Sequence, residues 1–118
     1  RRGAGRQGLG RLLHLRANDV VDLARAAELL ATLDGASYVV RRSLHDPKNI
    51  RLTKKAIRMA FETQARGLGF SMVELLSTCN TGWGVTPVES LKWLEEHMIP
   101  AFPLGDYKIA PEVAALKF

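Results

Sequence analysis

The spacing of apolar and polar residues divides the chain into helical and extended segments. From Asn18 or Asp19 to about Leu33, hydrophobic residues fall on several sides of a helix, which predicts a helix with neighbours on more than one face. Residues 37–42 are rich in β-branched and aromatic side chains and predict a strand. A second apolar run, over residues 70–76, predicts another strand that is mostly buried.

A helix-start signal separates the two predicted strands. Asp46 offers a side-chain oxygen to the first backbone N–H groups of a helix, and Pro47 suits the first helical position. We expect this helix to run to about Arg66. Its inner face is predicted to contain the apolar residues Ile50, Ala56, Ile57, Ala60, Phe61 and Ala65.

The C-terminal third contains a loop and then another helix. Residues 77–85 include two glycines and are expected to form the loop. Thr86 and Glu89 have the spacing of a capping box, and Pro87 suits the first turn, so a helix should begin there. Pro100 and Pro103 are expected to end this helix, and the remaining residues are expected to wrap a surface. The side chains predicted to point inward are Val88, Leu91, Leu94 and Met98.

The order strand, helix, strand is a βαβ unit, so the two strands should be parallel and the fold class is α/β with a C-terminal helix. Two strands cannot form a stable sheet alone, which predicts that they belong to a larger parallel sheet. Ligands of open α/β sheets bind beyond the carboxyl ends of the strands. The loops at that edge are residues 43–46 and 77–85, and we expect any site there.

Length and composition exclude several classes of protein. The chain has 118 residues, of which 47% are hydrophobic and 25% charged, and this is the composition of a single globular domain. It contains no apolar run long enough to cross a bilayer and no visible secretory signal. The single cysteine, Cys79, excludes an intramolecular disulfide and a zinc site of several cysteines. Together these features favour a cytoplasmic location.

The net charge of +5 belongs to the N-terminal segment. Five arginines lie among the first sixteen residues, which contain no acidic residue, and the rest of the chain is neutral. We therefore predict a basic, poorly ordered arm over residues 1–17 and a domain over residues 18–118. The alternative to an enzyme is a non-catalytic binding module whose arm contacts nucleic acid or an acidic protein. The arm lacks aromatic residues for stacking, which argues against nucleic acid.

Cys79 is the main candidate for chemistry in this chain. It follows a predicted strand in a loop with two glycines, where a thiolate could ligate a metal or a cluster or act as a nucleophile. The alternative is a buried, inert cysteine. His45 lies at the same predicted edge and permits a Cys–His pair, but the chain offers no obvious third member of a catalytic triad.

The segment around Cys79 has a specific run of residues that resembles a known family. The run is formed by Ser77, Cys79, Thr81, Trp83, Gly84, Thr86, Pro87, Met98, Ile99, Pro100, Pro103, Leu104 and Gly105. Over residues 27–108 the chain resembles the C-terminal part of the thiamine-diphosphate-binding β subunit of 2-oxoacid:ferredoxin oxidoreductases. The branched-chain (2-oxoisovalerate) and 2-oxoglutarate members are the most similar. Asn80 and Gly82 depart from the residues that are common in that family.

The resemblance implies part of an enzyme that oxidatively decarboxylates a 2-oxoacid with coenzyme A, giving acyl-CoA and CO2 and reducing ferredoxin. The implied cofactors are thiamine diphosphate, Mg2+ and a [4Fe–4S] cluster, and the implied partners are the α subunit and further small subunits. Cys79 matches the fourth cysteine ligand of the cluster, and Thr81 and Trp83 are expected near it on the same loop. The family's Cys-x-x-Cys-Gly and Gly-Asp-Gly motifs are missing from this chain, so we expect a C-terminal portion that is inactive alone.

Overall fold

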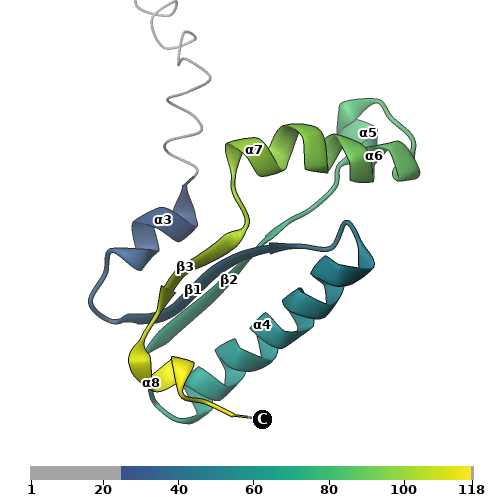
Figure 1. The fold of residues 1–118 in the computed structure, drawn as a ribbon. Coiled ribbons are helices and arrows are strands. Elements are labelled where there is room, and N and C mark those ends of the chain that lie inside the picture. The colour runs from purple at the N-terminus through teal and green to yellow at the C-terminus, as the bar shows by residue number, and fades with distance from the viewer. Residues whose placement is uncertain (1–24, 118) are drawn as a thin grey trace, which may run out of the picture.

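The computed structural model describes residues 25–117, which form a three-stranded mixed sheet with helices on both faces (Figure 1). The strands are β1 (Ala36–Ser43), β2 (Phe70–Leu76) and β3 (Gly105–Ile109), in the order β2-β1-β3. β1 pairs parallel with β2 and antiparallel with β3. The α/β class and the parallel βαβ unit are therefore confirmed, whereas the antiparallel β3 was not expected from the sequence.

The helix α4 (Pro47–Ala65) connects β1 to β2 and begins at the predicted signal. The backbone N–H of Asn49 donates to the Asp46 carboxylate at 2.7 Å, so Asp46 is the N-cap. The chain leaves the helix at Gly67, whose positive φ of 65° is a conformation that glycine adopts without strain.

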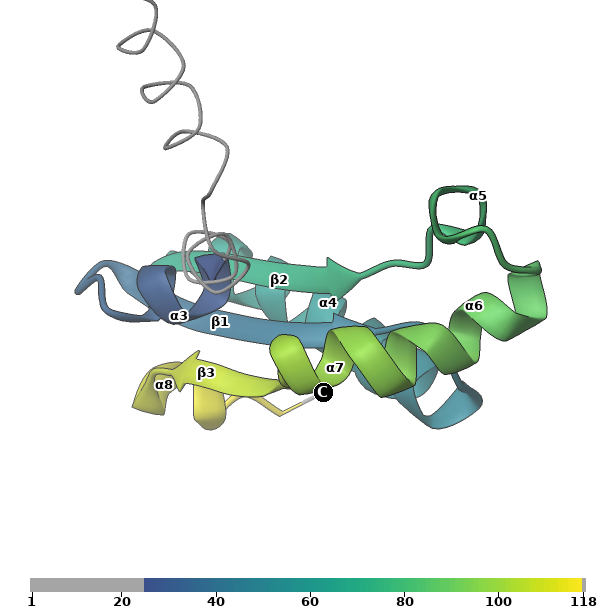
Figure 2. The same cartoon turned by 90° about the horizontal axis from the view of Figure 1, so that it is seen from above.

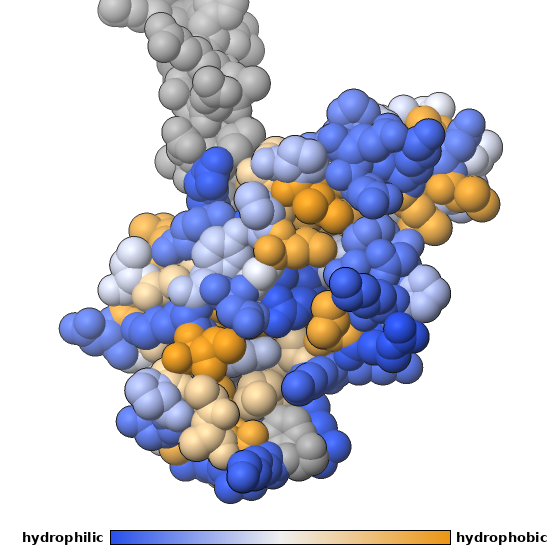
Figure 3. Space-filling view, in the orientation of Figure 1, coloured by the Kyte–Doolittle hydropathy of each residue, from blue (hydrophilic) through white to orange (hydrophobic). Residues whose placement is uncertain are grey.

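The inner face of α4 differs from the prediction. Its buried residues are Thr53, Ala56 and Thr63, whereas Phe61 is 73% exposed. Both buried threonines are satisfied, because Thr53 donates to the Ser43 carbonyl at 2.8 Å and Thr63 donates to a carbonyl of its own helix. Small side chains with internal hydrogen bonds let the helix approach the sheet closely. Met59 packs partly buried against the same core, whereas other large hydrophobic side chains stay exposed, and apolar patches are visible on the face shown in Figure 3.

Successive residues of β1 supply two cores on opposite faces of the sheet. Val40 packs with Ala56 of α4 and with Val113 of α8 (Pro111–Ala114). Val39 packs on the other face with Ala27 of α3 (Ala26–Ala31). The described part of the first helix ends at Ala31, earlier than predicted, and its expected start lies outside the described residues, as does the basic arm.

An arm of short helices extends past the carboxyl end of the sheet (Figure 2). It consists of α5 (Asn80–Trp83), α6 (Pro87–Trp93), the π-helical turn η1 (Leu94–Met98) and α7 (Ile99–Ala101). The predicted loop thus contains a helical turn, and the predicted capping box at Thr86 and Glu89 is present. The helix passes through Pro100, because the wider π turn before it removes the need for an N–H on the proline, and it ends at Ala101, before Pro103.

β2 is less buried than predicted because it forms an edge of the sheet and pairs only with β1. The other edge is β3, which occupies part of the predicted surface-wrapping tail. Its five residues include alternating charged side chains, Asp106 and Lys108, and so lack the apolar run that marks the other strands. No helix within residues 25–117 is long and apolar enough to cross a membrane.

Candidate functional site

The two loops expected at the ligand-binding edge meet at one pocket. This cavity has a volume of about 240 Å³ at the carboxyl ends of β1 and β2. Its wall combines the loop after β1, the loop after β2 and the first half of the arm. The lining residues are Leu44, His45, Leu75, Leu76, Ser77, Thr78, Leu91 and Leu94. The sequence predicted the two loops and the burial of Leu94, but it did not indicate that the helix closes the pocket. Leu91 lines the pocket while it stays partly exposed, and the inward direction predicted for Val88 is wrong, because this side chain is 77% exposed.

His45 is held in place by its neighbours in the first loop. Its Nδ1 lies 2.5 Å from the Ser43 hydroxyl oxygen, and its Nε2 lies 3.2 Å from a carboxylate oxygen of Asp46. Hydrogen bonds from the backbone and side chain of Asn49 lower the pKa of Asp46, so this carboxyl group stays ionised beside the ring. Both ring nitrogens are thus engaged, and the Cys–His pair that the sequence permitted is not formed.

This serine, histidine and aspartate do not form a nucleophilic site. Ser43 is completely buried, so its hydroxyl cannot reach a substrate. Asp46 caps α4 at the same time, which gives it a structural role. The arrangement instead fixes an imidazole at the wall of an apolar pocket, where its hydrogen bonds set its orientation.

Cys79 is exposed, so the buried position considered as an alternative from the sequence is wrong. It precedes α5 as the N-cap residue and makes no capping hydrogen bond with its side chain. Its sulfur lies over Gly82, 2.7 Å from the position that a Cβ on residue 82 would occupy. The glycine therefore accommodates the thiol itself. Gly84 has a different function, because its φ of 68° forms the left-handed C-cap of α5.

Thr81 and Trp83 lie on the same helical turn as Cys79, in different environments. Thr81 is exposed. The indole of Trp83 stacks on Trp93 of α6, with ring centroids 4.1 Å apart and an interplanar angle of 24°. Trp93 in turn contacts the ring of His97 at 4.8 Å. The aromatic contacts attach α5 to α6 within the arm, so the position of Cys79 depends on the position of α6.

The arm is anchored to the sheet by Arg41, whose position in the sequence indicated only a strand residue. Its guanidinium is completely buried and donates to Glu28 of α3 at 2.8 and 2.6 Å and to Glu74 of β2 at 3.0 Å. It also donates to the Pro103 carbonyl at 3.2 Å, just beyond α7, and to the Tyr107 hydroxyl at 2.7 Å. A charged residue inside an apolar strand was the signal that could have identified this centre.

The pKa values of Arg41 and Glu28 are each shifted by the other group. Burial alone would lower the pKa of Arg41, but its hydrogen bonds to Glu28 and the nearby charge of Glu74 raise it. The hydrogen bonds from Arg41 lower the pKa of Glu28 to about 2, against the opposing effect of burial. Three strands, one helix and the end of the arm are therefore linked through one ion-pair network.

A metal site cannot be completed from the residues that the structure describes. Among residues 25–117, no group of three or more His, Cys, Asp or Glu side chains is arranged to hold a metal ion. Cys79 can supply one exposed thiolate, whereas a [4Fe–4S] cluster needs four ligands. The donor set therefore fits a single contributed ligand and does not fit a complete cluster or a Mg2+ site.

The fold and the site define an α/β segment with a pocket and an exposed cysteine at the carboxyl edge of its sheet. Over 81 residues this chain is 37% identical to the ketoisovalerate oxidoreductase subunit VorA of Methanothermobacter marburgensis, and to the subunit of the same name from Methanothermobacter thermautotrophicus. The aligned part is 69% of this chain and 17% of each relative, so the chain spans only a small part of their length. This similarity indicates homology with the matching part of those subunits.

Comparison with family models and with solved structures gave no match.

Proposed function

We propose that this chain is part of a subunit of a 2-oxoacid oxidoreductase that decarboxylates its substrate oxidatively with coenzyme A and reduces ferredoxin. The observation that carries the proposal is the 37% identity over 81 residues with ketoisovalerate oxidoreductase subunits. A branched-chain 2-oxoacid is the substrate class most consistent with the names of those relatives. The proposal assigns the chain to the thiamine-diphosphate-binding β subunit, an assignment that rests on the sequence resemblance because the relatives are named subunit VorA.

In this proposal Cys79 is the fourth ligand of a [4Fe–4S] cluster that transfers single electrons when bound. Two observations support that role. The thiol is exposed, and it lies at the carboxyl edge where α/β sheets present ligands. Gly82 lets the sulfur lie close to the backbone of its own turn, and the Trp83–Trp93 stack fixes that turn on α6. Thr81 and Trp83 would then border the cluster and limit its contact with water.

The apolar pocket beside His45 would shield the reacting groups from solvent. Its leucines exclude water, and the hydrogen bonds of His45 to Ser43 and Asp46 hold the imidazole in a fixed orientation at the pocket wall. Thiamine diphosphate, Mg2+ and the other three cluster ligands would be held by other parts of the enzyme. For that reason we expect the 118-residue chain alone to be colourless and inactive.

The competing function is a binding module with a basic arm. The basic arm, residues 1–17, lies outside the described residues, and the similarity to an oxidoreductase subunit over 69% of the chain favours the enzymatic function. Salt-sensitive binding of nucleic acid or of an acidic protein, lost when residues 1–16 are deleted, would favour this alternative.

The proposal is tested by purifying the chain with its natural partners. An affinity tag is placed on the chain in its source organism, and the recovered complex is assayed for reduction of methyl viologen with 2-oxoisovalerate, 2-oxoglutarate or pyruvate. Reduction that requires both a 2-oxoacid and coenzyme A is expected. Recovery of the chain with partners that show no 2-oxoacid-dependent reduction would contradict the proposal.

A further inference from the structure

A second cavity lies between α4 and β3 and shares no lining residue with the carboxyl-edge pocket. Its volume is about 360 Å³, which falls within the ~300–1,000 Å³ range of small-molecule sites. It exists because α4 packs over β1 and β2 and leaves the same face of β3 uncovered. The cleft therefore follows from the fold and not from the position of a loop.

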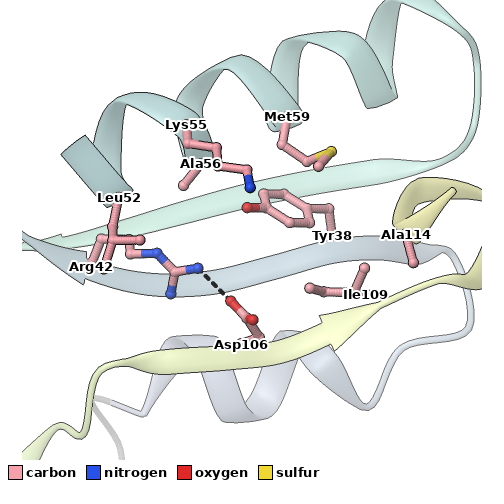
Figure 4. Close-up of a pocket in the computed structure, with 9 residues that line it drawn as sticks. All are labelled: Tyr38, Arg42, Leu52, Lys55, Ala56, Met59, Asp106, Ile109 and Ala114. Atoms are coloured by element: carbon pink, nitrogen blue, oxygen red, sulfur yellow. Dashed lines mark hydrogen bonds and ion pairs between the residues drawn. The ribbon is translucent and has the colours of Figure 1, made fainter. Parts of the chain in front are cut away.

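One side of this cleft is apolar. Leu52 and Met59 line it from α4, and Ile109 and Ala114 line it from the β3 and α8 side (Figure 4). Leu52 and Ile109 remain 43% and 38% exposed, so these residues present hydrophobic surface to the solvent that fills the cleft. A ligand with an aliphatic group would remove that surface from water.

The polar side of the cleft is rich in hydrogen-bond donors and has an excess of positive charge. Arg42 forms an ion pair with Asp106 across β1 and β3, which is neutral as a unit. The Nε of Arg42 is nevertheless buried without an acceptor in the described structure. Lys55 has no carboxylate partner among residues 25–117. In Figure 4 its ammonium and the hydroxyl of Tyr38 both point into the cleft.

We propose that this cleft binds a small amphipathic carboxylate, with its anionic end near Lys55 and its aliphatic part between Met59 and Ile109. The unneutralised ammonium selects a negative charge, and the hydroxyl of Tyr38 adds a donor of the kind that a carboxylate accepts. The apolar wall selects an aliphatic group over an inorganic anion. The small volume of the cleft favours a free organic acid over a protein segment. The inference does not depend on the proposed enzymatic function.

The test uses hexanoate and its neutral analogue hexanamide as probes of the 118-residue chain, measured by calorimetric titration. Hexanoate is expected to bind about tenfold more tightly than hexanamide, because a hydrogen bond between two charged groups strengthens binding by about that factor relative to a neutral one. Lys55→Met should weaken hexanoate by about tenfold and leave hexanamide unchanged, since methionine keeps the apolar stem. Lys54→Met is the matched control, because Lys54 is an exposed lysine on the same helix that does not line the cleft.

A second variant tests whether the probes bind in the cleft. Ala114→Leu fills the apolar end of the cleft from an exposed position, so it should weaken the binding of both probes. In the original chain, but not in this variant, the methyl resonance of Met59 should shift when hexanoate is added. Circular dichroism and thermal unfolding of each variant verify that it is folded. The inference is overturned if hexanoate does not bind the original chain at millimolar concentration, if both probes bind equally, or if Lys54→Met and Lys55→Met behave alike.

Discussion

The sulfur of Cys79 occupies the space that a side chain on Gly82 would need, since a Cβ at position 82 would lie 2.7 Å from that sulfur. Such a distance is well below van der Waals contact, so any larger residue must displace the thiol. The pair therefore explains why a glycine follows the cysteine by three positions inside a helical turn.

Gly82→Ala should alter the reactivity of Cys79 with little loss of stability. The sulfur is the end of a flexible side chain and can rotate away, so we expect faster reaction with a thiol reagent such as DTNB. Gly84→Ala provides the contrast. It has free space but a φ of 68°, so it should lower the free energy of unfolding by about 1 kcal/mol without changing thiol reactivity. Equal reaction rates for the original chain and Gly82→Ala would show that the contact does not constrain the sulfur.

The ion pair between Arg41 and Glu28 should make stability depend on pH under acidic conditions. The pKa of Glu28 is lowered to about 2 in the folded chain, from 4.5 for the unperturbed group. A lowered pKa means that the carboxylate contributes stability above pH 4.5 and that this contribution is lost as the pH falls towards 2. Chemical unfolding measured across this interval should show a decrease that is smaller in Glu28→Gln.

Removing Arg41 should be more damaging than removing either of its partners. Arg41→Met leaves Glu28 and Glu74 without their shared cation, and we expect a loss of about 3–5 kcal/mol. Glu28→Gln keeps one carboxylate beside the guanidinium and should cost about 2 kcal/mol. Unfolding of both variants by urea, compared with Glu62→Gln at an exposed helical pair, measures the difference. Similar losses in the two Arg41-network variants would contradict a shared centre.

The stack of Trp83 on Trp93 should be visible by spectroscopy. Two indoles 4.1 Å apart couple electronically, so the far-ultraviolet circular dichroism spectrum should contain a paired positive and negative band. Trp83→Leu and Trp93→Leu should each abolish this couplet and cost about 1 kcal/mol beyond the loss of buried area. A couplet that persists in either single variant would show that the rings are not stacked in solution.

Much of the fold could be predicted because local signals and the global fold agree. Asp46 and Pro47 start α4, and β-branched residues mark β1, so the βαβ unit was predictable without tertiary information. β3 was missed because it is a short edge strand held by pairing with β1, which no local pattern encodes. The continuation of the helix through Pro100 depended on a π turn, which the sequence does not indicate.

The candidate site was predictable in location and less so in detail. The carboxyl-edge rule located the loops beside one pocket, and Cys79 is exposed there. The engagement of His45 by Ser43 and Asp46 depends on the backbone conformation of one loop, and the stacking of Trp83 depends on the contact between α5 and α6. Arg41 contacts residues up to 66 positions away in the chain, so its role required the structure.

The central claim is tested most directly by the iron content and electron paramagnetic resonance spectrum of the native complex carrying Cys79→Ser. Ser77→Ala, at an exposed position in the same loop, is the matched control. If Cys79 completes a [4Fe–4S] cluster, the serine variant should lose iron and the signal of one reduced cluster, while thiamine diphosphate binding and Ser77→Ala remain unchanged. An unaltered iron content and spectrum in Cys79→Ser would contradict the assignment of this cysteine as a cluster ligand.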